Sequence, residues 1–203
     1  MQSRVLPFTL LFAGLVLGCG LLTGTWRAPI SPDWLDRLGM APMDLRRGAW
    51  WRIVTCLLPT HGGAVFWGSL GIGCWSNGLA ERRFGTRVAV ETFVLAHLAS
   101  LFLVSFLVVL PMDWMGSALG ESLALARDVG GSGGYYGCLG LGIAGLRSPH
   151  RRRCWHTLML LILAGRLVGS LWLEAEHATL HGDLAHPIAY ATGVLMARLR
   201  FSR

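Results

Sequence analysis

Six runs of mainly apolar residues recur along the chain, and arginine-bearing polar segments separate them. A helix needs about 20 mainly apolar residues to cross a membrane. The runs cover residues 6–22, 61–80, 88–110, 132–146, 155–173 and 184–199. They predict an all-α, polytopic membrane protein in which residues 1–203 form a single six-helix domain. The first run also has the length of a signal peptide, but the later runs favour a retained membrane anchor.

The composition argues against a water-soluble domain of this size. Charged residues make up 14% of the chain and hydrophobic residues 53%, whereas soluble domains carry about 25% charge. The net charge of +7 comes from arginine clusters between the apolar runs, which is typical of membrane loops rather than of a nucleic-acid site. The five cysteines form no CxxC pair and have no metal-like spacing. We therefore expect no disulfide framework, no metal and no cofactor.

The distribution of arginine predicts the orientation in the membrane. With both termini cytoplasmic, eleven arginines lie on the inner side, six on the outer side and one, Arg166, inside the fifth run. Cytoplasmic loops carry such an excess of positive charge. The compact chain, with arginine as its only basic residue, favours a bacterial inner (cytoplasmic) membrane. Residues 26–60 form a long first outer loop, whose tryptophans suit the lipid interface.

A serine and a histidine in different runs are predicted to lie at similar depth. Ser132 precedes Arg147 by 15 residues, about 22 Å along a helix that rises ~1.5 Å per residue. His186 precedes Arg198 and Arg200 by 12 and 14 residues, about 18–21 Å on the same basis. The two side chains therefore fall within about one helical turn of each other in depth.

A serine beside a histidine is the minimal pair of nucleophile and general base. Backbone N–H groups at the start of the Ser132 helix would stabilise an oxyanion, and Gly130, Gly131 and Gly133 would allow a close approach. Helix packing explains the bare pair equally well, because glycine and serine are common where membrane helices touch. A histidine within a span is rarer and favours function.

At these positions the chain resembles the rhomboid family of intramembrane serine proteases, over about residues 45–200. The conjunction of motif spacings is more specific than any single motif. The matching segments, in the order in which the family has them, are Trp51-Arg52, residues 78–85 with Glu81 and Arg83, residues 130–133 followed by Tyr136, and His186 followed by Gly193.

The resemblance implies a rhomboid-like fold and a protease that acts without a metal or cofactor. By it, Ser132 is the nucleophile, His186 is the general base with no third acid, and Tyr136 packs against the histidine. The fifth span would act as a lateral gate. Peptide bonds would be hydrolysed in or near the transmembrane segments of single-span or tail-anchored membrane proteins.

The second span departs from the family, which has a histidine and an asparagine there that stabilise the oxyanion. The corresponding positions hold Val65 and Ser69, or Phe66 and Leu70 after a one-residue shift. His61, at the mouth of this span, is a candidate substitute. Loss of one oxyanion donor typically reduces turnover by about 10²–10³-fold. The alternative is therefore a catalytically weak or inactive rhomboid-like protein that binds transmembrane clients.

The remaining polar residues of the spans and outer loops have simpler interpretations. His97 is predicted to be a hydrogen-bonded packing residue, and Glu91 to pair with a loop arginine or to reach the lipid interface. Arg166 must face protein or a water-filled cavity. A small transporter is a third hypothesis, for which Arg166 and His97 are the only support. Asp128 is expected to be a solvated loop acid rather than an assistant to Ser132. The outer loop before the last run is expected to hold Glu174, Glu176, His177, His181 and Asp183, with the two histidines solvated. Pro187 predicts that the sixth helix begins or kinks at His186.

Overall fold

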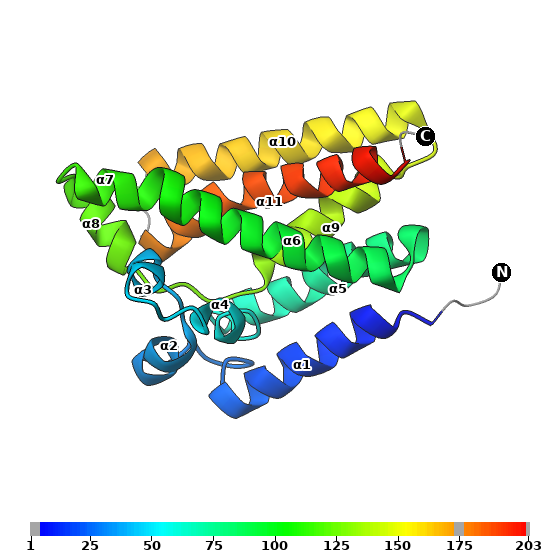
Figure 1. The fold of residues 1–203 in the computed structure, drawn as a ribbon. Coiled ribbons are helices and arrows are strands. Elements are labelled where there is room, and N and C mark those ends of the chain that lie inside the picture. Colours follow the sequence, from blue (N-terminus) through cyan, green and yellow to red (C-terminus); the bar gives the residue numbers. More distant parts are fainter. Residues whose placement is uncertain (1–4, 173–176, 202–203) are drawn as a thin grey trace.

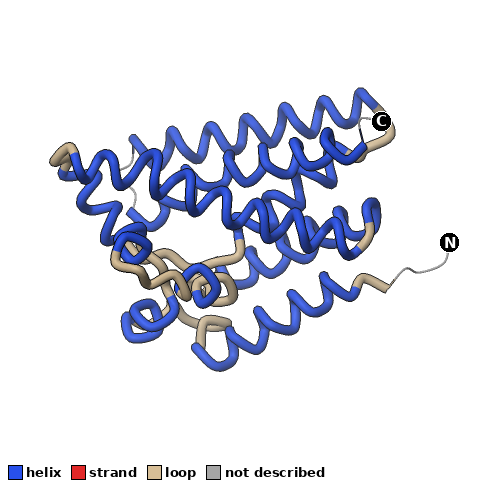
Figure 2. The backbone as a smooth tube through the Cα atoms, viewed as in Figure 1, coloured by secondary structure: helices blue, strands red, loops and turns tan. Residues whose placement is uncertain are grey.

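The computed structural model describes residues 5–172 and 177–201, and every regular element among them is a helix. Figure 1 shows these elements and Figure 2 the loops between them. The elements are α1 (Pro7–Thr23), α2 (Pro32–Leu38), α3 (Pro42–Arg46), α4 (Arg52–Thr55), α5 (Ala64–Phe84), α6 (Thr86–Val104), the π-helical η1 (Ser105–Val109), α7 (Leu110–Trp114), α8 (Ala118–Leu125), α9 (Ser132–Ala144), α10 (Pro149–Trp172) and α11 (His177–Phe201).

Helix α9 is the centre of the bundle. It contacts α5, α6, α10 and α11, while α1 packs on α5 and α10 packs mainly on α11 (Figure 1). Every residue of α9 from 133 to 143 is buried. Its glycines make this possible: a Cβ on Gly140 would lie 2.3 Å from the carbonyl oxygen of Tyr190, and one on Gly193 of α11 would lie 1.8 Å from that of Gly137. Helices α9 and α11 are therefore in backbone contact.

A buried carboxylate joins α1 to α5. Glu81 accepts hydrogen bonds from the backbone N–H groups of Phe8 and Thr9, at 3.0 and 2.9 Å, and from the Thr9 hydroxyl. The first N–H groups of a helix have no partner within the helix, so Glu81 caps the start of α1. The Glu81 carboxylate also accepts a hydrogen bond from Thr86 at the start of α6. Three helices thus meet at one side chain.

The long first loop forms a compact layer of short helices, α2 to α4. Asp44 organises it: the carboxylate accepts from the backbone N–H of Ala41 at 2.9 Å and from Arg127 at 2.6 Å. Arg52 donates to the carbonyl oxygen of Gly39. The contact with Arg127 ties this layer to the segment that leads into α9.

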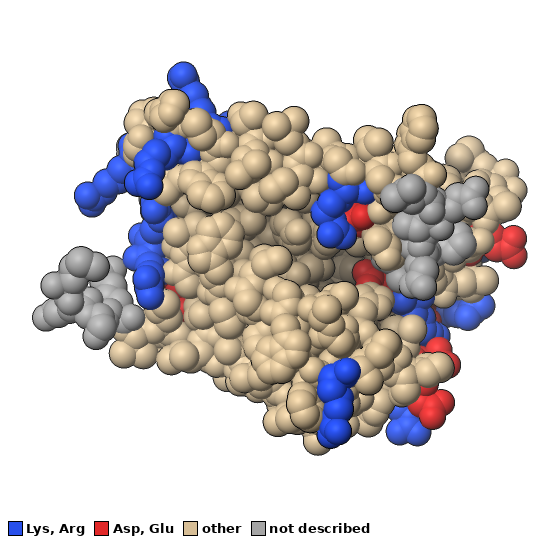
Figure 3. Space-filling model, turned by 180° about the vertical axis from the view of Figure 1, so that it is seen from behind, with Lys and Arg blue, Asp and Glu red and all other residues tan. Residues whose placement is uncertain are grey.

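Two helical segments are long and apolar enough to cross a membrane, namely 86–114 and 149–172, and α1 is a shorter apolar helix. Many large apolar side chains point outward, among them Leu161 of α10, which is 66% exposed, and Leu22 of α1, which is 81% exposed. Most charged residues gather toward the two ends of the face in Figure 3. The surface between them is largely uncharged, apart from a hollow with blue and red side chains at its rim and one blue side chain below it.

Several predicted helix boundaries were wrong. The third run was predicted to end at residue 110, yet the helix continues through the π-helical turn of η1 and past Pro111 to Trp114. Helix α11 begins at His177 rather than near residue 184, and Pro187 lies inside it. His186 is therefore not at a helix start. Glu174 and Glu176, predicted to lie in the loop before this helix, are outside the described residues.

Candidate active site

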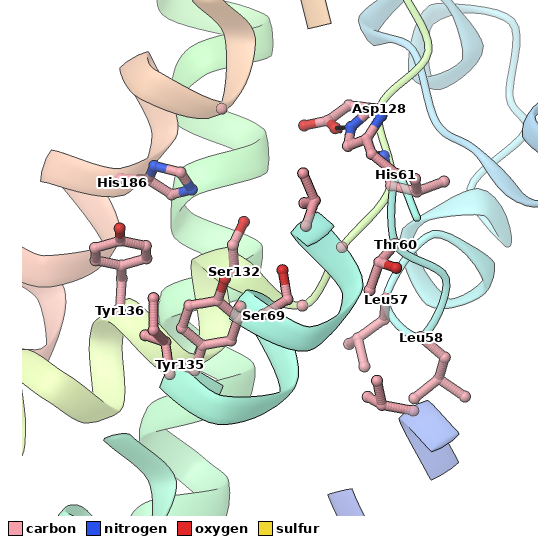
Figure 4. Close-up of a pocket in the computed structure, with 18 of the residues that line it drawn as sticks. Leu57, Leu58, Thr60, His61, Ser69, Asp128, Ser132, Tyr135, Tyr136 and His186 are labelled. Atoms are coloured by element: carbon pink, nitrogen blue, oxygen red, sulfur yellow. Dashed lines mark hydrogen bonds and ion pairs between the residues drawn. The ribbon is translucent and has the colours of Figure 1, made fainter. Parts of the chain in front are cut away.

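A cavity of about 440 Å³ opens among the start of α9, the first half of α11, one face of α5 and the segment before α5 (Figure 4). Both members of the predicted pair, Ser132 and His186, line it. The other lining residues are Phe12, Val16, Leu57, Leu58, Thr60, His61, Val65, Gly68, Ser69, Ile72, Asp128, Val129, Gly130, Gly131, Tyr135, Tyr136, Arg166, Thr179 and Gly182.

Ser132 is the first residue of α9, and the loop before it is built for that position. Gly130 has a φ of +139°, a backbone conformation that residues other than glycine rarely adopt. Its N–H donates to the carbonyl oxygen of Cys56 at 2.7 Å, which fixes the loop against the end of α4. A Cβ on Gly131 would lie 3.0 Å from the carbonyl oxygen of Leu57. No side chain caps the start of α9. The first backbone N–H groups of this helix therefore donate no hydrogen bond to a capping side chain.

His186 lies on α11 with its ring stacked on Tyr136. The ring centroids are 4.2 Å apart and the planes differ by 23°. The histidine is 8% exposed, and its Nδ1 atom faces the Asp183 carboxylate at 3.6 Å. In Figure 4 the Ser132 side chain and the His186 ring point toward one another across the cavity. The family resemblance implied the packing of Tyr136 against this histidine, and the structure has it.

A second group of ionisable side chains lines the cavity near the loops that lead into α5 and α9. Asp128, expected to be a solvated loop acid, contacts His61 Nε2 at 2.8 Å and His181 Nδ1 at 3.7 Å. Its backbone N–H and carbonyl oxygen both pair with Met40. Burial acts to raise the pKa of Asp128, but the contacts with His181 and His61 outweigh it and hold the pKa well below its ordinary value. The prediction for Asp128 was therefore wrong.

The expectation for His181 was also wrong, because the residue is 1% exposed inside α11. When segments distant in the sequence bury a polar side chain, the local sequence alone still suggests an exposed loop residue. His177 lies in the first turn of α11, and its side chain is outside the described part of the chain.

Of the two alignments for the second span, the one with Val65 and Ser69 faces the cavity. Phe66 is fully buried and packs against Gly20 of α1, so its side chain does not line the cavity. Ser69 lies beside the phenol of Tyr135 (Figure 4). The sequence comparison showed only that Ser69 replaces the family's asparagine. It did not indicate that the Ser69 hydroxyl could itself donate a hydrogen bond to an oxyanion.

Gly133 is the one predicted site glycine that does not line the main cavity. It faces α6 instead, where a Cβ would lie 2.5 Å from the Ser100 hydroxyl. Its role in this structure is the close packing of α9 on α6. Gly130, Gly131, Tyr136 and His61 all line the main cavity, as expected of positioning residues.

Arg166 has a partner that the sequence did not reveal. Its Nε atom donates to the Asp183 carboxylate at 2.7 Å, and Ser170 donates to the other oxygen of the same group. Asp183 was expected in a loop and is instead 3% exposed within α11. The prediction for His97 is confirmed, because it is buried with its Nε2 atom 3.1 Å from the Ile53 carbonyl oxygen. Glu91 pairs with an arginine as expected, but its partners Arg87 and Arg200 lie in helices rather than in a loop.

Comparison of the chain with known protein families, with curated proteins and with solved structures gave no match. The chemistry of this site must be inferred from its geometry. A serine at an uncapped helix start, a buried histidine with one face stacked and a cavity that touches both are suited to nucleophilic attack on a carbonyl group.

Proposed function

We propose that the protein is an intramembrane serine endopeptidase of the rhomboid type, in which Ser132 and His186 hydrolyse peptide bonds in or near the transmembrane segments of membrane proteins. The observation that supports it best is that these two residues, 54 positions apart in the sequence, line one cavity with Tyr136 packed on the histidine ring.

In the proposed reaction His186 takes the hydroxyl proton as Ser132 Oγ attacks the scissile carbonyl carbon. The tetrahedral intermediate collapses when the C–N bond breaks, and the imidazolium gives its proton to the leaving amine. Water then attacks the acyl-enzyme with His186 again as the base, which releases the carboxylic acid and restores the serine. No metal or cofactor takes part.

The oxyanion would be stabilised by donors that this chain does possess. The backbone N–H groups at the start of α9 point outward from the helix end, where the helix dipole also favours negative charge. Ser69 of α5 adds a hydroxyl that lines the same cavity. His61 lines the same cavity but contacts Asp128, so its proposed part is to shape the outer mouth rather than to donate directly.

The proposed membrane domain consists of the six long helices α1, α5, α6 with its extension to α7, α9, α10 and α11. Their apolar outer faces and the charged ends of the molecule suit a bilayer. Helix α10 buries only Met159, Leu163 and Ser170, and Arg166 of this helix lines the cavity. A single-span or tail-anchored substrate would therefore approach from the side of α10.

A client-binding protein without protease activity is the second candidate. One observation favours it: Val65 gives the cavity an apolar side chain at the position where rhomboids have an oxyanion histidine. The retained Ser132 and His186 have no evident use in such a protein. Activity therefore remains the stronger proposal.

Cleavage of a single-span reporter by the purified protein in liposomes tests the proposal. We expect cleavage by the wild type and loss of cleavage in both Ser132→Ala and His186→Ala, each with unchanged thermal stability. Cleavage that survives Ser132→Ala would refute the mechanism. Absence of wild-type cleavage across several reporters, with reporter binding retained, would favour the client-binding function.

A further inference from the structure

Asp183 is a buried carboxylate for which the proposed dyad has no use. It is 3% exposed and lies one helical turn before His186 on α11. A buried carboxylate is retained only when charged or hydrogen-bonding partners compensate for the loss of water. Its partners come from two directions: Arg166 and Ser170 on α10, and His186 on its own helix.

The contact with His186 involves one particular nitrogen. Nδ1 lies 3.6 Å from Asp183 Oδ1, is buried, and has no hydrogen-bond partner among the described residues. This spacing is longer than a hydrogen bond, but such contacts are often long in free enzymes and shorten when substrate binds. With its proton on Nδ1 facing the carboxylate, the ring would leave the lone pair of Nε2 free to act as a base.

We propose that Asp183 is a positioning residue for His186: it keeps the imidazole proton on Nδ1 and stabilises the imidazolium that forms when Ser132 is deprotonated. The inference rests on the proposed protease function and adds a third group to the dyad. Arg166 and Ser170 fix the carboxylate, so the position of α10 determines where this acid lies. Asp183 thereby links the position of α10 to that of the general base, His186.

Other charged or titratable groups also surround the histidine. Tyr136 of α9 stacks on the ring, and Arg166 of α10 contacts the Asp183 carboxylate. The Asp128 carboxylate, with His181 beside it, lies near Gly182 on the side where the Cε1 and Nε2 atoms of the ring also approach that glycine. None of these interactions places a carboxylate against Nδ1. Asp183 is therefore the described residue whose removal should change the protonation site of the ring.

The test measures which nitrogen of His186 carries the proton. Protein with ¹⁵N-labelled histidine is studied in micelles at about pH 8, where imidazole is mainly neutral, and His186→Ala identifies the signal. We expect an Nδ1–H ring in the wild type and a shift of the proton toward Nε2 in Asp183→Ala. Asp183→Asn should keep the Nδ1–H form, because Arg166 still donates to the amide oxygen and leaves it beside Nδ1.

Kinetics provide the second measurement. In Asp183→Ala we expect kcat to fall roughly 10- to 100-fold, as for loss of a charge-assisted hydrogen bond, with KM within about twofold because substrate does not touch this acid. Asp183→Asn should recover part of the loss. Glu91→Gln is the matched control, because it also breaks an ion pair to α11, through Arg200, but lies far from His186.

Two results would overturn the inference: a wild-type ring protonated on Nε2, or an Asp183→Ala ring that keeps its proton on Nδ1. If Asp183→Ala does not fold, the double variant Arg166→Gln/Asp183→Ala removes both charges and provides the same measurement. The protonation site can be determined even if the wild type cleaves no reporter, so failure of the proposed function and failure of this inference are distinguishable.

Discussion

At the scale of single residues, the cavity combines the proposed nucleophile and base with donors from a third helix. Ser69 projects its hydroxyl from α5 into the space that Ser132 and His186 also line. It stands where the rhomboid resemblance predicted an amide. A hydroxyl can donate one hydrogen bond to a developing oxyanion, so Ser69 is the described side chain best placed to replace the missing donors.

Replacement of Ser69 by alanine should therefore lower kcat by up to about 10²-fold, the low end of the range for loss of one oxyanion donor, with little change in KM. Reporter cleavage rates measure it. Ser76→Ala is the matched control on the same helix, because the Ser76 hydroxyl is buried without a hydrogen-bond partner among the described residues. Equal rates for wild type and Ser69→Ala would remove Ser69 from the oxyanion site.

At the scale of helices, apolar runs predicted six long helices but not where they begin and end. Helix α11 starts at His177 rather than at 184 because polar side chains in its first turns are buried by partners from elsewhere. His181 contacts Asp128, and Asp183 contacts Arg166 of α10. No local pattern encodes such contacts, which is also why the sequence identified Ser132 and His186 but missed Asp183.

The backbone contact between α9 and α11 leads to a prediction about the stability of the helix bundle. Gly193→Ala should destabilise the protein by about 1–3 kcal/mol or more, since added core atoms force strain and the new Cβ would overlap the Gly137 carbonyl group. Gly165→Ala on α10 should be tolerated, because a Cβ there meets nothing within 4 Å. Thermal unfolding in detergent compares them. Equal midpoints for the two variants would contradict the close α9–α11 packing.

At the scale of the whole molecule, the bundle has an apolar exterior and a cavity whose largely apolar lining includes Ser132, His186 and Asp128. The end of α5, the start of α10 and the end of α11, which carry arginines, lie at one end of the bundle (Figure 1); in the proposed orientation this end would be the cytoplasmic one. The cavity residues His61 and Asp128 come from the loops that lead into α5 and α9. A bilayer around this bundle would contact its apolar faces, and water would enter at the cavity.

The central claim, that His186 activates Ser132 as a nucleophile, is tested most directly with a phosphonofluoridate probe. Attack by Ser132 Oγ would form an O–P bond, release fluoride and pass the hydroxyl proton to His186. Mass spectrometry of the labelled protein should find one adduct, on Ser132, in the wild type and none in His186→Ala. An adduct on Ser69 in place of Ser132, undiminished labelling in His186→Ala, or no adduct on Ser132 in the wild type would contradict the account.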